Sequence, residues 1–224
     1  MVKKILFVLG VLSATAVLAE DGNQLLTLDH YVRIKSTVPS IAGQSTPIYV
    51  RERTKAATSL RAASLEDRVV LFVHGAGTPA EVAFDVPYQD YSWMAYLAHS
   101  GFDVFSMDTS GYGCSTRPPA MNDPCNLSQA QQKKFLPAFL SAGCPASYSR
   151  NVTTITSDWN DIDGVVDYIQ PLRHVDRVSM VAWSLGGPRA GGYAARHPEG
   201  AETLASGACI RAYVIDGTAG CRAR

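Results

Sequence analysis

The sequence predicts an α/β protein with a mostly parallel sheet that carries helices on both faces. Residues 68–73 and 177–182 are continuous apolar runs rich in β-branched side chains, which is typical of strands buried on both faces of a parallel sheet. Residues 91–100 and 156–168 have apolar side chains at helical spacing. Strands and helices therefore alternate along the chain, as they do in α/β folds.

Other segments fit around this alternation. Residues 30–34 and 47–51 alternate polar and apolar side chains, which predicts two half-buried strands that form an antiparallel edge of the sheet. Residues 102–107 predict one more short strand, and residues 188–197 predict a helix.

Residues 121–150 interrupt this rhythm with prolines, cysteines and a glutamine-rich stretch. We interpret them as an insertion over the sheet, part of a lid, in which residues 128–140 predict a helix. Cys125 and Cys144 flank this stretch, and we expect them to form a disulfide in an oxidising compartment; two free thiols are the alternative. The cysteine count of five is odd, so a monomer keeps at least one unpaired thiol.

The first 19 residues have the pattern of a secretory signal peptide. Lys3 and Lys4 precede an apolar run over residues 5–18, and Val17 and Ala19 place small residues before Glu20. We expect residues 1–19 to be removed and the chain to be secreted or periplasmic. An N-terminal membrane anchor is the alternative, although the run is shorter than the roughly 20 residues that span a bilayer. After signal removal we expect no stable membrane span.

Composition excludes some partners. Hydrophobic residues make up 46% of the 224 residues, which is ample for a buried core, and the formal net charge is zero. A neutral balance gives no electrostatic reason to expect nucleic acid as a partner. No cysteine or histidine spacing resembles a zinc site. The oligomeric state stays open.

A serine lies where a predicted buried strand meets a predicted helix, in the segment AWSLGG at residues 182–187. Small residues two positions before and after the serine allow the strand and the helix to approach closely. A sharp turn there would hold the hydroxyl above the sheet edge, beside a helix N-terminus that favours negative charge. The segment predicts Ser184 as a nucleophile; a capping serine in an ordinary turn is the alternative.

Two glycine-containing loops follow other predicted strands. In HGAG, residues 74–77, Gly75 leaves backbone N–H groups accessible. The N–H groups of Ala76 and Leu185 could bind an oxyanion together. For His74 we favour a structural role, in which its ring hydrogen-bonds the loop, over proton transfer.

The second loop, DTSGYGCS at residues 108–115, lies beside the predicted nucleophile. Gly111 and Gly113 allow a tight turn there. We expect the Asp108 carboxylate to order this loop rather than to act in catalysis.

These three motifs, in this order and spacing, resemble the α/β-hydrolase superfamily over about residues 29–198. The resemblance implies Ser184 as nucleophile and the backbones of Ala76 and Leu185 as oxyanion donors. It implies no cofactor. Members hydrolyse esters, thioesters, amides, lactones, epoxides or carbon–halogen bonds, and a serine argues against the last two because those branches use a carboxylate nucleophile. We therefore expect acyl transfer from a small-molecule ester or related substrate to water.

The end of the sequence departs from the family pattern, in which the acid and the histidine follow the nucleophile. After Ser184 the only histidine is His197, at the end of the next predicted helix. We therefore predict an α/β-hydrolase fold that lacks its last strands. Residues 20–199 would form the core and residues 200–224 an atypical tail, as a frameshift, fragment or natural end. Residues 209–215 could add one strand, followed by Asp216 as a weak candidate for the acid.

Two functions remain open at this point. The first is a serine hydrolase, feeble or inactive in this chain because no general base accompanies Ser184. The second is an inactive fragment or pseudoenzyme that binds a hydrophobic ligand or a partner chain.

Overall fold

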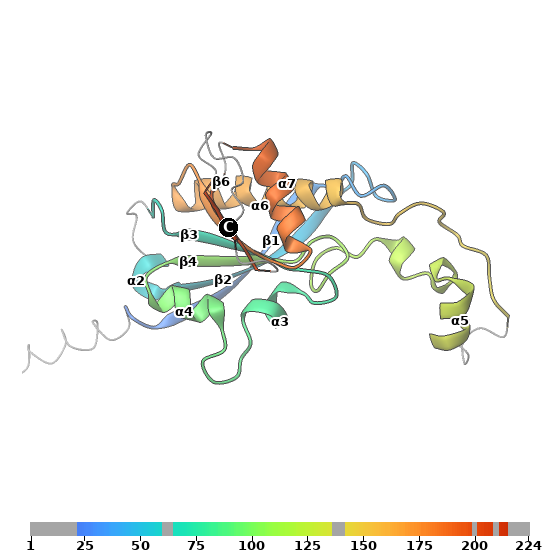
Figure 1. Ribbon diagram of the computed structural model, residues 1–224, viewed down its shortest axis with the longest axis horizontal. Coiled ribbons are helices and arrows are strands. Elements are labelled where there is room, and N and C mark those ends of the chain that lie inside the picture. The colour runs from blue at the N-terminus through green and yellow to red at the C-terminus, as the bar shows by residue number, and fades with distance from the viewer. Residues whose placement is uncertain (1–21, 60–64, 136–141, 199–200, 208–210, 215–224) are drawn as a thin grey trace, which may run out of the picture.

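The computed structural model describes residues 22–59, 65–135, 142–198, 201–207 and 211–214. The described residues form one seven-stranded sheet with the order β1-β2-β4-β3-β5-β6-β7 (Figure 1). The predicted signal peptide at residues 1–19 and the predicted acid Asp216 lie outside the described residues. So do Cys209 and Cys221.

The centre of the sheet is a block of parallel strands, formed by β4 (Asp103–Met107), β3 (Val69–Val73), β5 (Val178–Trp183) and β6 (Ala201–Gly207). β3 pairs with β4 on one side and β5 on the other, and β5 pairs with β6, all in parallel. Every residue of β3 and β4 is buried, as expected for strands covered on both faces. The α/β class predicted from the continuous apolar runs is therefore confirmed.

Antiparallel strands close both ends of the sheet. β1 (Leu25–Lys35) and β2 (Ser45–Lys55) form a long hairpin, and β2 pairs antiparallel with β4. This hairpin is the antiparallel edge that the alternating sequence pattern predicts. A short helix, α2 (Ala56–Ser59), follows β2.

The sheet continues past residue 199, where we expected the core to end. β6 pairs with β5, and β7 (Arg211–Val214) pairs antiparallel with β6. β7 corresponds to the additional strand predicted within residues 209–215. The placement of β6 in the atypical tail is therefore corrected, because backbone pairing extends the parallel block whatever the local composition.

Helices cover the sheet on both faces (Figure 1). α6 (Ile155–Arg173) and α7 (Gly186–Arg196) pack against one face. The predicted apolar stripe of α6 lies in this core, with Ile162, Val165, Val166 and Ile169 at 0 to 1% exposure. Two short helices, α3 (Ala80–Phe84) and α4 (Trp93–His99), cover the other face through Phe84, Met94 and Ala98.

Two details of the helices differ from the sequence prediction. The N-cap of α6 is Thr154, which forms a reciprocal pair of hydrogen bonds with Ser157. The helix therefore begins slightly earlier than predicted. In α4, Trp93 and Tyr96 point to solvent at 62% and 72% exposure, so the buried face is carried by Met94 and Ala98.

We expected the insertion at residues 121–150 to lie over the sheet, but its described residues, 121–135 and 142–150, form an arm that extends away from the sheet (Figure 1). It contains α5 (Gln129–Phe135), and the 3₁₀ turns η1 (Pro119–Met121) and η2 (Pro124–Asn126) lie at its start. The predicted helix at 128–140 is thus described as far as Phe135.

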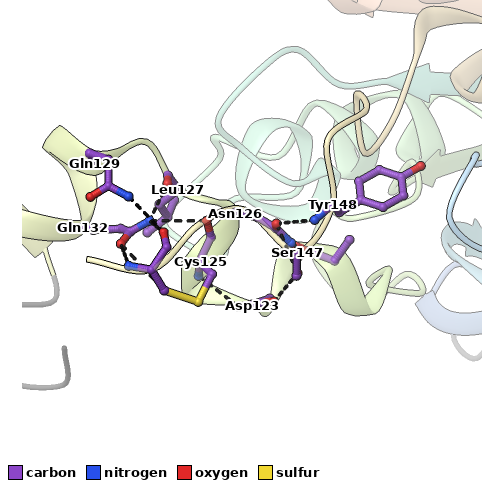
Figure 2. The surroundings of a disulfide bond; sticks show 10 residues. Asp123, Cys125, Asn126, Leu127, Gln129, Gln132, Ser147 and Tyr148 are labelled. Carbon is purple, nitrogen blue, oxygen red and sulfur yellow. Dashed lines mark hydrogen bonds between the residues drawn. A yellow bond between two sulfur atoms is a disulfide. The ribbon is translucent and has the colours of Figure 1, made fainter. Parts of the chain in front are cut away.

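A disulfide joins Cys125 to Cys144, as we expected, with the two Cα atoms 5.2 Å apart. Figure 2 shows how the buried Gln132 amide ties the two cysteine segments together. Its Nε2 donates to the carbonyl oxygens of Cys125, Leu127 and Cys144, and its Oε1 accepts from the Cys144 N–H at 3.0 Å. The arm is therefore held by its own covalent and polar bonds.

Within the described part of the chain, no helix combines the length and the apolar character needed to cross a bilayer. Cys114, on the loop after β4, is an exposed free thiol.

We predict that Phe72→Ala lowers the free energy of unfolding by about 3–5 kcal/mol, because it leaves a cavity between the sheet and α3. Phe72 is fully buried, and its ring centroid lies 4.7 Å from that of Phe84. Urea denaturation measures the loss. Tyr96→Ala, which removes an exposed aromatic side chain, is the control and should change stability by less than about 0.5 kcal/mol. Equal effects of the two changes would contradict this placement of the core.

We also predict that replacing Cys125 and Cys144 together by serine loosens the arm. The disulfide joins cysteines with a sequence separation of 19. Removing a disulfide that closes a loop of this length lowers the free energy of unfolding by about 3 kcal/mol. Limited proteolysis should then cut residues 121–150 faster than in the parent chain. Cys114→Ser is the matched control because it removes a thiol that forms no disulfide. An unchanged cleavage rate in the double variant would show that the disulfide does not stabilise the arm.

Candidate active site

Ser184 occupies the turn between β5 and α7. Its φ is +56°, in the left-handed region that non-glycine residues rarely adopt, and the residue is exposed. Leu185 follows with helical dihedrals as the N-cap of α7. The turn thus has the strained, exposed geometry that the sequence motif predicts, at the carboxyl end of a central parallel strand.

Close backbone contacts explain the small residues around Ser184. A Cβ atom on Gly186 would lie 2.2 Å from the Val73 carbonyl oxygen, and one on Gly75 would lie 2.8 Å from the Ser184 Cβ. Ala182, two residues before the serine, is 1% exposed. The turn therefore touches the end of β3 directly, and Gly75 lies against Ser184.

His74 supports its loop from inside the protein. It is fully buried, and its Nε2 accepts a hydrogen bond from the Thr109 N–H at 3.1 Å. The proton of the neutral ring then lies on Nδ1, which donates to the Gly75 carbonyl oxygen at 2.7 Å. Burial lowers the pKa of the imidazole. Both ring nitrogens are engaged in loop contacts, which agrees with the structural role expected for His74.

Asp108 joins its own loop, residues 108–115, to the start of α3. Its carboxylate accepts hydrogen bonds from the Ala80 N–H at 2.7 Å and the Cys114 N–H at 3.0 Å. Gly113 has φ +45°, and a Cβ there would collide with the Asp108 carboxylate. Gly111 has φ +90° and lies against Met121. These contacts explain both glycines and agree with the loop-ordering role expected for Asp108.

Arg189, on the helix that follows Ser184, is a buried residue that the sequence analysis missed. It is 3% exposed, and its Nη1 donates to the carbonyl oxygens of His74 at 3.0 Å and Gly75 at 3.2 Å. Its Nε donates to Asp158 Oδ2 at 2.8 Å, and its guanidinium carbon lies 5.2 Å from the centroid of the Tyr112 ring. α6, α7 and the 74–77 loop are thereby joined through one side chain.

Asp161 supports the other loop from α6. Its carboxylate accepts hydrogen bonds from the Ser110 N–H at 2.7 Å and the Ser110 hydroxyl at 3.2 Å. Burial raises the pKa of the Asp161 carboxyl to about 7, although the hydrogen bonds from Ser110 oppose this rise. For Asp158, burial also raises the pKa, against the attraction of Arg189.

Sequence signals for these supporting residues are weak. Asp158 and Asp161 lie one helical turn apart beside the apolar stripe of α6, and Arg189 precedes Ala190 on the buried face of α7. Charged residues on such faces usually lie at the solvent boundary. The only sequence signal for this network is therefore positional: two aspartates lie beside the apolar face of α6, and one arginine lies beside the apolar face of α7.

Among the residues that the structure describes, no histidine is hydrogen-bonded to Ser184 as a general base would be. His197 ends α7, where its Nδ1 lies 3.7 Å from Asp163 Oδ1 and its ring stacks on Tyr193. At about 1.5 Å of rise per residue, this end of the helix is roughly 15–20 Å from the serine. None of the hydrogen bonds described for this structure joins Ser184 to a histidine.

No group of three or more histidine, cysteine, aspartate or glutamate side chains in the described residues could hold a metal ion.

A family model described as the alpha/beta hydrolase fold matches residues 68–207. The chain belongs to the alpha/beta hydrolase family. The match includes the 74–77 loop, the Ser184 turn and β6. A comparison with curated proteins gives no match.

Several solved structures are similar to this chain at low identity. An epoxide hydrolase from Vigna radiata shares 16% identity over 80% of this chain and 38% of its own, with a TM-score of 0.46. Epoxide hydrolase I from potato (Solanum tuberosum) shares 19% identity over 80% of this chain and 39% of the potato protein, with a TM-score of 0.43. A presumed lipase from Sulfolobus solfataricus shares 16% identity over 82% of this chain and 45% of the lipase, with a TM-score of 0.49. The chain spans less than half the length of each of these proteins.

The buried Asp161 predicts a pH dependence of stability. Its pKa in the folded protein is about 7, above its ordinary value of 3.8, so between these values the folded state binds more protons than the unfolded state. Stability therefore falls as pH rises through this window. Relative to Asp161→Asn, the parent chain should lose up to about 1.4 kcal/mol of unfolding free energy per pH unit.

Urea denaturation at several pH values between 4 and 8 measures this difference. Asp167→Asn, an exposed carboxylate on the same helix, is the control and should leave the pH profile of the parent chain unchanged. Parallel profiles for the parent chain and Asp161→Asn would contradict a raised pKa at this position.

Proposed function

We propose that this chain carries the site of an exported serine hydrolase that acts on small-molecule esters or related acyl compounds. The observation that carries the proposal is the conformation of Ser184. An exposed serine at φ +56° lies on a strand-to-helix turn whose neighbours are kept small by direct backbone contact. A strained position persists only where the surrounding structure enforces it, and such positions cluster at functional sites.

In the proposed reaction, the Ser184 hydroxyl oxygen attacks the carbonyl carbon of the ester and its proton passes to water. The resulting oxyanion lies between the N–H groups of Ala76 and Leu185. Two observations support this arrangement: Gly75 lies against Ser184, which places Ala76 nearby, and Leu185 is the first residue of the helical turn beneath it. Donors fixed by the backbone need no reorganisation when charge develops, which is the main source of their effect. The tetrahedral intermediate then expels the alcohol, which takes up a proton from water, and a second water molecule hydrolyses the acyl-enzyme to the carboxylic acid and free Ser184.

A serine nucleophile favours acyl chemistry within this family. The epoxide hydrolases to which the chain is structurally similar belong, by the family resemblance, to a branch with a carboxylate nucleophile. Ser184 cannot form the same alkyl-enzyme intermediate efficiently, because an alcohol is a much weaker nucleophile than a carboxylate at neutral pH. Esters, whose carbonyl carbon is polarised by the oxyanion donors, suit this serine better.

The expected rate is low. His74 uses both ring nitrogens in loop contacts and His197 lies at the far end of α7. Among the described residues no histidine is hydrogen-bonded to Ser184, and a serine hydroxyl without a general base stays protonated at neutral pH. The oxyanion donors and substrate binding alone still leave turnover above the reaction in water.

The absence of a histidine hydrogen bond to Ser184 among those described also favours a second candidate function. In this alternative the chain binds a hydrophobic ligand or a partner and does not catalyse. Saturable binding of a fatty-acyl ester without product release would select this candidate.

We predict that a fluorophosphonate probe labels the chain at Ser184 and that Ser184→Ala abolishes the labelling. Mass spectrometry of the proteolytic peptide that contains residue 184 identifies the modified residue. Ser149→Ala is the control, because this serine is also exposed but lies in a loop at the end of the arm. Equal labelling of the parent chain and Ser184→Ala would refute the nucleophile assignment.

A further inference from the structure

We propose that Arg189 is a positioning residue for the oxyanion site: it holds the peptide bond between Gly75 and Ala76 so that the Ala76 N–H faces the substrate carbonyl. This inference rests on the proposed function, because it assigns a role at the same site. It concerns a residue that contacts neither Ser184 nor substrate and acts only through the backbone of the 74–77 loop.

The carbonyl of Gly75 is fixed by two donors. His74 Nδ1 donates to it at 2.7 Å, and Arg189 Nη1 donates to it at 3.2 Å. The same Arg189 nitrogen also donates to the His74 carbonyl oxygen at 3.0 Å. Two successive carbonyl groups of the loop therefore point toward the buried guanidinium.

Peptide geometry then fixes the direction of the Ala76 N–H. The structure contains no cis peptide bond among its described residues, and in a trans peptide the C=O and N–H groups point to opposite sides. Since the Gly75 carbonyl points inward to Arg189, the Ala76 N–H points outward. Ala76 is exposed, whereas Gly75 and His74 are buried, so outward means toward the solvent side where Gly75 meets Ser184.

Arg189 is itself held rigidly. Its Nε bonds to Asp158 on α6, and its guanidinium lies over the Tyr112 ring on the loop after β4. Asp158 is 5% exposed and Arg189 is 3% exposed, so their attraction is weakly screened by solvent. A guanidinium has several donors in a fixed plane and can bind a carboxylate and two carbonyl oxygens at once, which an ammonium group does less well.

Arg189 also ties the two halves of the site to each other. It lies on α7, the helix that begins beneath Ser184, and it donates hydrogen bonds to the loop that carries Ala76. The position of the nucleophile turn and the position of one oxyanion donor are therefore both fixed by the same helix. Loss of this link should disturb transition-state stabilisation more than ground-state binding of a substrate.

The test compares the parent chain with Arg189→Met, which keeps much of the side-chain volume but removes every donor. The rate of fluorophosphonate labelling at saturating probe should fall by about 100-fold, as for the loss of one oxyanion donor. The probe concentration at half-saturation should change little, because the lost interaction acts in the transition state. Arg196→Met, on an exposed turn of the same helix, is the matched control and should label at the parent rate.

A second readout does not depend on chemistry at Ser184. With isotope-labelled glycine and alanine, nuclear magnetic resonance reports the Gly75 carbonyl carbon and the Ala76 amide directly. Both resonances should shift in Arg189→Met and stay in place in Arg196→Met. If near-ultraviolet circular dichroism shows that Arg189→Met does not fold, Arg189→Lys replaces it, and its labelling rate should lie below that of the parent.

The outcomes separate this inference from the proposed function. Parent-like labelling of a folded Arg189 variant would overturn the positioning role while leaving Ser184 as the nucleophile. If the parent chain is not labelled at all, the proposed function fails. The Gly75 and Ala76 resonances alone then test whether Arg189 positions the loop. Unmoved Gly75 and Ala76 resonances would then overturn the inference, and shifted ones would support it.

Discussion

The direct contact between the Ser184 turn and the end of β3 is the constraint on which the site depends. No side chain separates these two backbones at Gly75 and Gly186, where an added Cβ would lie 2.8 Å or less from its nearest neighbour. The distance from the serine to the 74–77 loop is therefore set by backbone packing rather than by rotamers. Such a distance survives side-chain motion, which is what a site that stabilises developing charge requires.

Below this contact, buried charged groups replace the apolar packing found elsewhere in the core. Arg189, Asp158, Asp161 and Asp108 are each at most 5% exposed, and each bonds to a loop backbone or to another member of the group. Burying these groups costs free energy that only their hydrogen bonds offset. Irregular loops with many free backbone groups need such partners, because apolar side chains cannot satisfy them. The charged layer thus gives the loops one fixed shape.

Much of this could be predicted from the sequence, because the signals were local. The continuous apolar runs predict the central parallel strands β3 and β5, and the small residues beside Ser184 predict the close turn. β3 is buried throughout as predicted, whereas every second residue of β5 is partly or fully exposed. β6 was missed because its small and polar residues carry no strand periodicity, and only pairing with β5 reveals it. Arg189 was missed for a similar reason: an arginine in a helix usually reaches solvent, and its carbonyl partners are more than 100 residues away in sequence.

The arm described above leaves the sheet after β4 and returns at the start of α6, so both of its ends lie at the carboxyl edge of the parallel strands (Figure 1). Its internal disulfide and the Gln132 bonds give it a shape that owes little to the sheet. Because the bonds that hold the arm together lie within it, its internal shape does not depend on packing against the sheet.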